Sequence, residues 1–382
     1  MRRLALRAVG TLAAVTLFPL DAAPSFAAPN PSEASRIQAD QWHLKYLNVR
    51  QAHRICRGSG VVVAVPDTGV DPHPDLARNL LPGTDIIAGG RGDGHRDANS
   101  HGTSVAGLIA AHGTAENVGA LGIAPEARIM PIVSAGADNR GHADDLAAAI
   151  EYATSHHADV ISISSTGATS TRLIRAVKEA LAADIVVVAG VGNQPETSSI
   201  GYPASEEGVI AVGGIDRSGR HATVSVTGPQ IDVAAPAVDI YSTSYGGKYS
   251  KGTGTSAATA IVAGAAALIR SKYPDLPAEE VAHRLTATAI DKGPPGRDDE
   301  YGYGVIDLVA ALTADVPPLG FESTAATPAA SNQALPGDES AGDDGATARG
   351  LVTLGVLAAA GGGYLVWRRR RRADDPPPRI SR

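Results

Sequence analysis

The chain has 382 residues, of which 43% are hydrophobic and 19% are charged, so it can form a packed core and is not disordered throughout. Its 33 basic and 40 acidic residues give a net charge of -7, which argues against a nucleic-acid-binding protein. The single cysteine, Cys56, excludes an intramolecular disulfide framework and a multi-cysteine zinc site, and we expect a buried structural residue rather than a catalytic thiol.

The first 27 residues have the pattern of a secretory signal peptide. A basic start precedes an apolar run, residues 8–20, which is too short to span a bilayer comfortably. Ser25 and Ala27 then place small residues at the -3 and -1 positions of a cleavage site. An uncleaved anchor helix is the alternative, and the short run argues against it.

Residues 37–313 are predicted to form one domain in which buried strands alternate with helices. Apolar, β-branched runs predict the strands, and apolar residues at three- and four-residue spacing predict the helices. This alternation predicts an α/β fold with a mainly parallel sheet and helices on both faces. Ligands of such sheets bind beyond the carboxyl ends of the strands, where we expect the functional residues. The predicted strands are 61–65, 129–133, 160–163 and 185–189, and the predicted helices are 144–154 and 172–183.

Three segments follow this domain. Residues 314–350 have few large apolar side chains and are predicted to be a disordered linker. Residues 351–367 are apolar and as a helix would be roughly 26 Å long, so we predict a single transmembrane helix. The arginine-rich tail, 368–382, is then expected in the cytoplasm, with the large domain outside the cell membrane. A nucleic-acid patch is the alternative explanation of the arginines.

Two candidate functional residues lie in the first half of the domain. Asp67 directly follows the first predicted strand, where a buried carboxylate needs a hydrogen bond or an ion pair. A turn or helix cap is the alternative role. His101 precedes the apolar spacing of Val105 to Ile109, which predicts a helix starting near the histidine. Because a helix N-terminus disfavours a cation, we expect His101 to be neutral and able to accept a proton.

Two more candidates lie in the second half. Ser256 begins a segment that is apolar nearly all round, which predicts a buried helix. Backbone N–H groups at such a helix start can stabilise developing negative charge, although an ordinary serine cap is the alternative. Asn193 lies in a glycine-rich turn after a predicted strand, either as a turn former or as a side-chain donor.

Aspartate, histidine and serine follow one another here in the order found in the subtilisin-like serine peptidases, the subtilases. The stretch from Gly58 to Leu312 resembles this family. The matching motifs are Asp67-Thr68-Gly69-Val70 with the later His73-Pro74-Asp75-Leu76, then His101-Gly102-Thr103, Gly254-Thr255-Ser256-Ala257-Ala258, and Tyr301 to Asp307.

The resemblance implies a subtilisin-like fold and a serine endopeptidase that hydrolyses proteins or peptides. Ser256 would be the nucleophile, His101 the general base and then acid, and Asp67 the support of the histidine. The Asn193 side chain and the Ser256 backbone N–H would form the oxyanion hole. The substrate backbone would pair with an extended segment made of Ser164, Ser165, Thr166 and Gly167.

The chain departs from the family pattern at a few places near these motifs, and none of the changes removes a catalytic group. No cofactor is implied; the family allows a structural calcium ion, for which the sequence assigns no ligands. Only about ten residues separate the signal peptide from Ile37, so activation by removal of a propeptide is not expected. The departures are Pro66, Val191-Gly192, Ala260 and Ile261.

The layout of signal peptide, subtilase domain, linker, single span and basic tail is similar to that of the mycosins, the membrane-anchored subtilases of type VII secretion. The segment from Gln41 to Leu47 is also similar to the part preceding their first motif. The resemblance implies a secretion-system membrane complex as a partner. It also leaves open an inactive or mainly scaffolding subtilase that stabilises this complex.

A metal hydrolase is an alternative from another class. Carboxylates and histidines crowd one stretch of the sequence, and both are adequate metal ligands. Their spacing matches no helical metal-binding motif, and glycine and proline mark loops between them. We therefore predict no metal at the site. These residues are Asp67, Asp71, His73, Asp75, Asp93, His95, Asp97 and His101.

Overall fold

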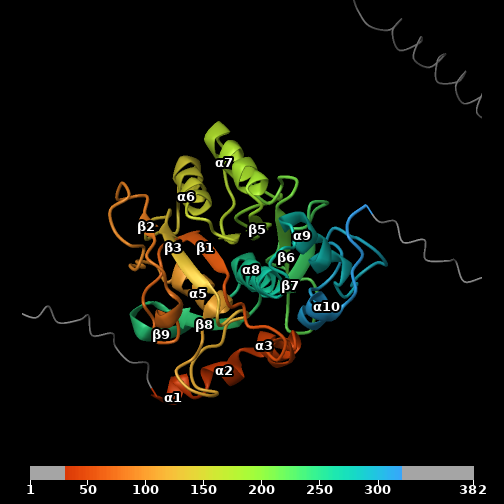
Figure 1. Cartoon of the computed structure of the whole chain (residues 1–382), viewed down its shortest axis with the longest axis horizontal. Helices are drawn as coiled ribbons and strands as arrows, with labels where there is room; N and C mark the ends of the chain where they lie inside the picture. Colours follow the sequence, from red (N-terminus) through yellow and green to blue (C-terminus); the bar gives the residue numbers. More distant parts are fainter. Residues whose placement is uncertain (1–30, 321–382) are drawn as a thin grey trace, which may run out of the picture. The chain divides into compact units, whose positions relative to one another are not determined.

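The computed structural model describes residues 31–320 and is shown in Figure 1. The predicted signal peptide, membrane span and basic tail lie outside the described residues, as does the linker after residue 320. Within the described part, no helix has both the length and the apolar character needed to cross a bilayer.

A parallel sheet of seven strands in the order β2-β3-β1-β4-β5-β6-β7 forms the centre of the described domain. The four predicted strands are confirmed as β1, β3, β4 and β5. Their apolar, mostly β-branched runs suit a parallel sheet, in which side chains are buried on both faces. The strands are β1 (Val62–Asp67), β2 (Thr84–Asp85), β3 (Arg128–Val133), β4 (Val160–Ile163), β5 (Val186–Gly190), β6 (Ile210–Ile215) and β7 (Val233–Pro236).

Helices cover both faces of the sheet, as the sequence predicts (Figure 1). The helices α6 (Ala143–Ser155) and α7 (Thr171–Ala182) cover one face, and α5 (His101–Ala110) and α8 (Thr255–Lys272) cover the other. Strand side chains alternate between two cores: Val63 and Val65 pack on the α5 and α8 side, and Ala64 packs on the α6 and α7 side. The alternation therefore decides which of the two cores each strand residue packs into.

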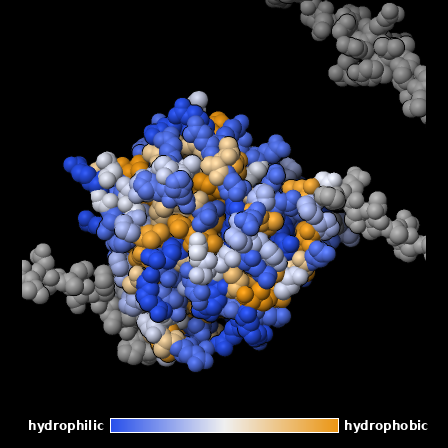
Figure 2. Space-filling model, viewed as in Figure 1, coloured by the Kyte–Doolittle hydropathy of each residue, from blue (hydrophilic) through white to orange (hydrophobic). Residues whose placement is uncertain are grey.

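Helix α8 packs against the strands from β4 to β7, so its apolar circumference is buried as predicted. A separate antiparallel pair, β8 (Ile240–Ser244) and β9 (Lys248–Gly252), lies beside α5. Two further helices complete this side, α9 (Ala278–Ala287) and α10 (Leu308–Thr313). Figure 2 shows hydrophilic residues over most of the visible surface, with apolar residues in scattered groups.

The residues before β1 form four short helices that belong to the domain. The Gln41 side chain is hydrogen-bonded to the backbone of Leu121 and Tyr241, and α4 packs against α10. Cys56 is free and half-buried against the core, rather than fully buried as expected. The helices are α1 (Pro31–Ala34), α2 (Ile37–Asp40), α3 (Trp42–Tyr46) and α4 (Val49–Ala52).

Candidate active site

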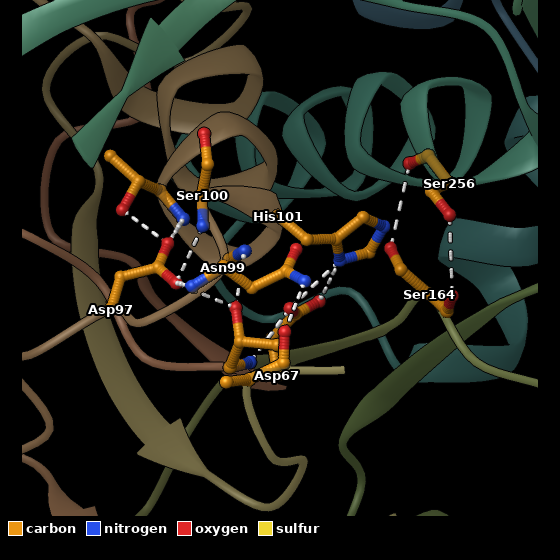
Figure 3. Close-up of polar contacts among 11 residues, drawn as sticks. Asp67, Asp97, Asn99, Ser100, His101, Ser164 and Ser256 are labelled. Atoms are coloured by element: carbon orange, nitrogen blue, oxygen red, sulfur yellow. Dashed lines mark hydrogen bonds and ion pairs between the residues drawn. The ribbon is translucent and has the colours of Figure 1, made fainter. Parts of the chain in front are cut away.

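Three of the predicted residues come from three different elements and meet at the carboxyl edge of the sheet (Figure 3). Asp67 is the last residue of β1, His101 is the first residue of α5, and Ser256 is the second residue of α8. In Figure 3 the His101 ring lies between Asp67 and Ser256. The helix starts predicted for His101 and Ser256 are confirmed.

Asp67 and His101 form a close, doubly contacted pair. The Nδ1 atom of His101 lies 2.8 Å and 2.9 Å from the two carboxylate oxygens of Asp67. Asp67 is only 5% exposed, and it also accepts a hydrogen bond from the Thr68 N–H. With Nδ1 facing the carboxylate, Nε2 of the ring is left to face the cleft.

The close approach of α5 to β1 depends on Gly102. A Cβ atom on Gly102 would lie 2.1 Å from the carbonyl oxygen of Gly69 and 3.1 Å from Cβ of Asp67. Only glycine lets the helix start come so near to the strand end, so the residue after His101 helps to set the distance within the pair.

The pKa of His101 is raised, although its position at a helix start led us to expect that the neutral ring would be favoured. Burial lowers it, but the neighbouring carboxylate of Asp67, through its charge and its hydrogen bond, and the charge of Asp97 together raise the pKa above its ordinary value of 6.5. The helix N-terminus therefore does not decide the protonation of His101. The paired carboxylate stabilises the cation instead, which is the form that a general base becomes after it accepts a proton.

Asp97, which the sequence suggests only as a candidate metal ligand, holds together the turns beside Asp67 and His101. Its buried carboxylate accepts hydrogen bonds from the backbone N–H groups of Asn99, Ser100 and Thr103. It also accepts from the hydroxyls of Thr103 and Thr68, and the Thr68 hydroxyl in turn accepts from the Gly102 N–H. Asp97 thus ties the turn before His101 to the turn after Asp67.

The turn held by Asp97 is strained at one point. Ser100, directly before His101, has a φ of 91°, which is unfavourable for a residue with a side chain. Its hydroxyl is hydrogen-bonded to that of Ser244 at 2.5 Å. A signal for this turn exists in the sequence, because aspartate commonly accepts hydrogen bonds from backbone groups two and three residues later.

The hydroxyl of Ser256 points away from the histidine. It donates a hydrogen bond of 3.3 Å to the carbonyl oxygen of Ser164, as Figure 3 shows. Within the described part of the chain, no hydrogen bond joins Ser256 to His101. In this structure the Ser256 proton is therefore directed at the Ser164 carbonyl.

Asn193 is fixed by the residue before Ser256. Its side-chain oxygen accepts hydrogen bonds from the Thr255 N–H at 2.8 Å and from the Thr255 hydroxyl at 3.2 Å. The amide nitrogen is thereby left to donate into the cleft. Thr255 lies in one of the matching motifs, but this role could not be predicted from the sequence, since its partner is more than sixty residues away along the chain.

Two adjoining hollows surround these groups. One, of about 450 Å³, is lined by His101, Asn193 and Ser256, and another, of about 360 Å³, is lined by Asp67. Ser164, Ser165 and Thr166 line both, and Gly167 lines only the second. The segment predicted to pair with a substrate backbone thus borders both hollows.

The alternative of a metal centre is not supported by the geometry. Among residues 31–320, no three histidine, cysteine or acidic side chains converge as a metal site. The crowded residues make other contacts: Asp75, for example, accepts hydrogen bonds from the Tyr249 hydroxyl and the Ala120 N–H. A hydroxyl, an imidazole backed by a carboxylate, and an amide donor are instead the groups of nucleophilic acyl transfer.

Comparisons with known proteins agree with this chemistry. Residues 58–304 match the model of the subtilase family. The chain is 40% identical to subtilisin DY of Bacillus licheniformis over 260 residues, or 67% of this chain and 92% of that protein. It is 37% identical to a thermostable alkaline protease of Halalkalibacterium halodurans over 278 residues, or 72% and 74% of the two chains.

Solved structures with a similar fold include two mycosins. One is the serine protease MycP1, described as an essential component of the type VII (ESX-1) secretion system, with a TM-score of 0.66 and 33% identity over 75% of this chain and 91% of that one. The other is the MycP3 protease from the type VII (ESX-3) secretion system, with a TM-score of 0.65, 32% identity and the same coverage.

Proposed function

The chain belongs to the subtilase family and is a subtilisin-like serine endopeptidase, and we propose that Asp67, His101 and Ser256 are its catalytic triad. The observation that supports this assignment is the contact of Nδ1 of His101 with both carboxylate oxygens of Asp67, on the side of the ring away from Ser256.

The proposed reaction is acyl transfer in two steps. The Ser256 hydroxyl turns from the Ser164 carbonyl to Nε2 of His101, loses its proton to the ring and attacks the scissile carbonyl carbon. Asp67 stabilises the imidazolium. His101 then protonates the leaving amine, and a water molecule, deprotonated by His101, hydrolyses the acyl-enzyme.

The negative charge that develops on the carbonyl oxygen needs donors in place. The Asn193 amide nitrogen supplies one, because Thr255 holds the amide oxygen. The backbone N–H of Ser256 supplies another, since the first N–H groups of a helix have no partner within it. The substrate backbone pairs with the segment from Ser164 to Gly167 by β-augmentation.

Removal of the nucleophile tests the triad. The variant Ser256→Ala is expected to lose at least about a thousandfold in kcat on a peptide substrate, as removal of a triad serine does in this family. A serine-directed phosphonate should label the native protein at Ser256, and EDTA should leave acute activity intact. Ser271→Ala, at the other end of α8, is the matched control. Loss of activity with EDTA and no labelling would contradict the serine mechanism.

We also propose that the domain acts outside the cell membrane, anchored by residues 351–367, and that it processes components of type VII secretion. Two observations support this proposal: the order of the segments predicted from the sequence, and the similarity to MycP1 and MycP3. The predicted segments are the signal peptide 1–27, the domain 37–313, the linker 314–350 and the tail 368–382. Alkaline extraction of membranes tests the anchor: the full chain should stay with the membrane, and a chain ending at residue 350 should be released.

A mainly scaffolding role in a secretion complex is the second candidate, favoured by the description of MycP1 as an essential component. Cells that carry Ser256→Ala discriminate between the two. If secretion fails with this variant as it does on deletion, proteolysis is the task. If secretion persists with the variant and fails only on deletion, the scaffold is the main function.

A further inference from the structure

A positively charged cleft lies on the outer side of the N-terminal helices, although the chain as a whole is acidic. Two hollows of about 860 Å³ and 610 Å³ share Gln38, Arg50, Arg54 and Leu121, so they form one continuous depression, here named the basic cleft. Six cations line the basic cleft: Lys45, Arg50, Arg54, Arg57, Arg78 and Arg217.

Most of these cations lack an ionic partner. Among residues 31–320, no carboxylate lies within ion-pair distance of Lys45, Arg50, Arg54, Arg78 or Arg217; only Arg57 is paired, with Glu126 at 2.6 Å. Glu116 is the one acidic residue of the lining. The cations of the lining thus outnumber its one carboxylate, so an anionic occupant would gain from several of them.

The basic cleft also contains an aromatic platform that is held rigidly. The rings of Trp42 and Tyr46 meet edge to face at 5.6 Å, and the indole N–H of Trp42 donates to the Val238 carbonyl at 3.0 Å. The Arg217 guanidinium lies 5.7 Å from the centroid of the Trp42 ring. Aromatic and arginine side chains presented together are typical of protein-binding surfaces.

The lining of the basic cleft shares no residue with the hollows around Ser256. An occupant here would therefore leave the catalytic groups accessible. The helices that carry the cleft are fixed to the domain through the buried Leu44, Leu47 and Val49 and through Gln41, so the site needs no folding step before it binds.

We propose that the basic cleft is a docking site for an acidic peptide segment of a partner protein, with an aromatic or aliphatic side chain packed on Trp42 and Tyr46. The charge complementarity selects the acidic residues, and the platform selects the apolar one. The concave form favours a peptide over a lipid bilayer, because a planar surface cannot enter a depression.

The test uses the phosphonate-inactivated full chain and a fluorescent peptide of roughly ten residues, rich in glutamate around one phenylalanine. We expect saturable binding that weakens as salt rises, since ionic contacts are screened. The double variant Arg50→Glu with Arg54→Glu should bind about tenfold or more weakly. Both side chains are exposed, so folding is retained, and hydrolysis of a small peptide substrate should stay unchanged.

A matched charge change elsewhere serves as the control. Arg175 and Lys178 on α7 are 65% and 61% exposed, and their replacement by glutamate should leave peptide binding intact. Replacing the phenylalanine of the peptide by serine should weaken binding, as should Trp42→Ala. The proposal is overturned if the peptide does not bind, if the control variant weakens it equally, or if phosphatidylglycerol vesicles bind through Arg50 and Arg54 while the peptide does not.

Discussion

Asp97 shows how one residue without contact to the reacting atoms can govern the histidine. Its carboxylate holds the backbone of the strained turn at Ser100, and its charge helps to raise the pKa of His101. The geometry and the proton affinity of His101 thus depend on the same side chain.

The pH dependence of catalysis follows from the raised pKa. His101 must be neutral to accept a proton, so kcat/KM should rise with pH through a midpoint above 6.5 and fall at lower pH. In Asp97→Asn the loss of one negative charge favours the neutral ring, so the midpoint should move to lower pH. Initial rates across pH measure this shift. A loss of rate at every pH with an unmoved midpoint would assign Asp97 a structural role alone, and Asp93→Asn, at an exposed carboxylate, is the control.

The oxyanion donor gives a second prediction at this scale. Asn193→Ala should reduce kcat by about 10²–10³ and leave KM nearly unchanged, because the donor acts on charge present only in the transition state. That range was measured in subtilisin, a member of this family, and is applied here to Asn193. Thr255→Val keeps the backbone contact to Asn193 and loses only the hydroxyl contact, so a smaller decrease in kcat is expected. Equal losses from the two variants would argue against this division of roles.

The proposed catalytic groups were easier to locate from the sequence than the residues that support them. Asp67, His101, Asn193 and Ser256 each follow a strand or begin a helix, which are local signals. Thr255 acts through a residue far away in the chain, and Asp97 acts through the shape of a turn. The spacing of apolar residues in the sequence predicts neither contact. The resting position of the Ser256 hydroxyl is a rotamer choice that only the packed site decides.

At the scale of elements, the site is made by three segment ends brought to one edge of a parallel sheet. The strands with continuous β-branched runs were predictable to within two residues. Strands β6 and β7 were not predicted, because the paired glycines Gly213 and Gly214 and the alanines of 234–235 weaken the apolar signal. Their burial comes from α8 and from neighbouring strands.

Adding one methyl group at Gly102 should push helix α5 away from strand β1. In Gly102→Ala the new Cβ would meet the Gly69 carbonyl at 2.1 Å, so the two elements must move apart. We expect a loss of about 1–3 kcal/mol in the free energy of unfolding and a larger loss of activity than of stability. Thermal unfolding and kcat measure the two effects. Gly252→Ala, where a Cβ meets nothing within 4 Å and φ, as at Gly102, lies outside the left-handed region, controls for the loss of glycine itself in the unfolding measurement. Unchanged activity in Gly102→Ala would contradict the proposed spacing role.

At the scale of the whole molecule, stability should depend on keeping several buried histidines neutral. Burial lowers the pKa of His43 to about 3 and those of His53 and His73 to about 4. Both ring nitrogens of His43 lack a hydrogen-bond partner in the described structure. The unfolded chain would bind these protons more readily, so acidification favours unfolding.

The sign of this effect gives a further prediction. Below pH 6.5 the unfolded histidines become charged while the folded ones do not, so the free energy of unfolding should fall steadily as the pH drops toward 4. His43→Leu should flatten this dependence, and His157→Asn, at an exposed site, should not. Thermal unfolding across pH decides, and an unchanged slope in His43→Leu would refute the role of His43.

The loop between α9 and α10 lies on the other side of the sheet from the candidate active site. Arg297 donates to the carbonyl of Ile231, just before β7 begins, so the exposed Pro295 lies near the amino edge of the sheet, opposite the active-site edge. Because Cys56 is the only cysteine of the chain, Cys56→Ser combined with Pro295→Cys creates a single thiol for conjugation. Such a handle would let the enzyme be immobilised on a solid support with its active face turned toward the solution.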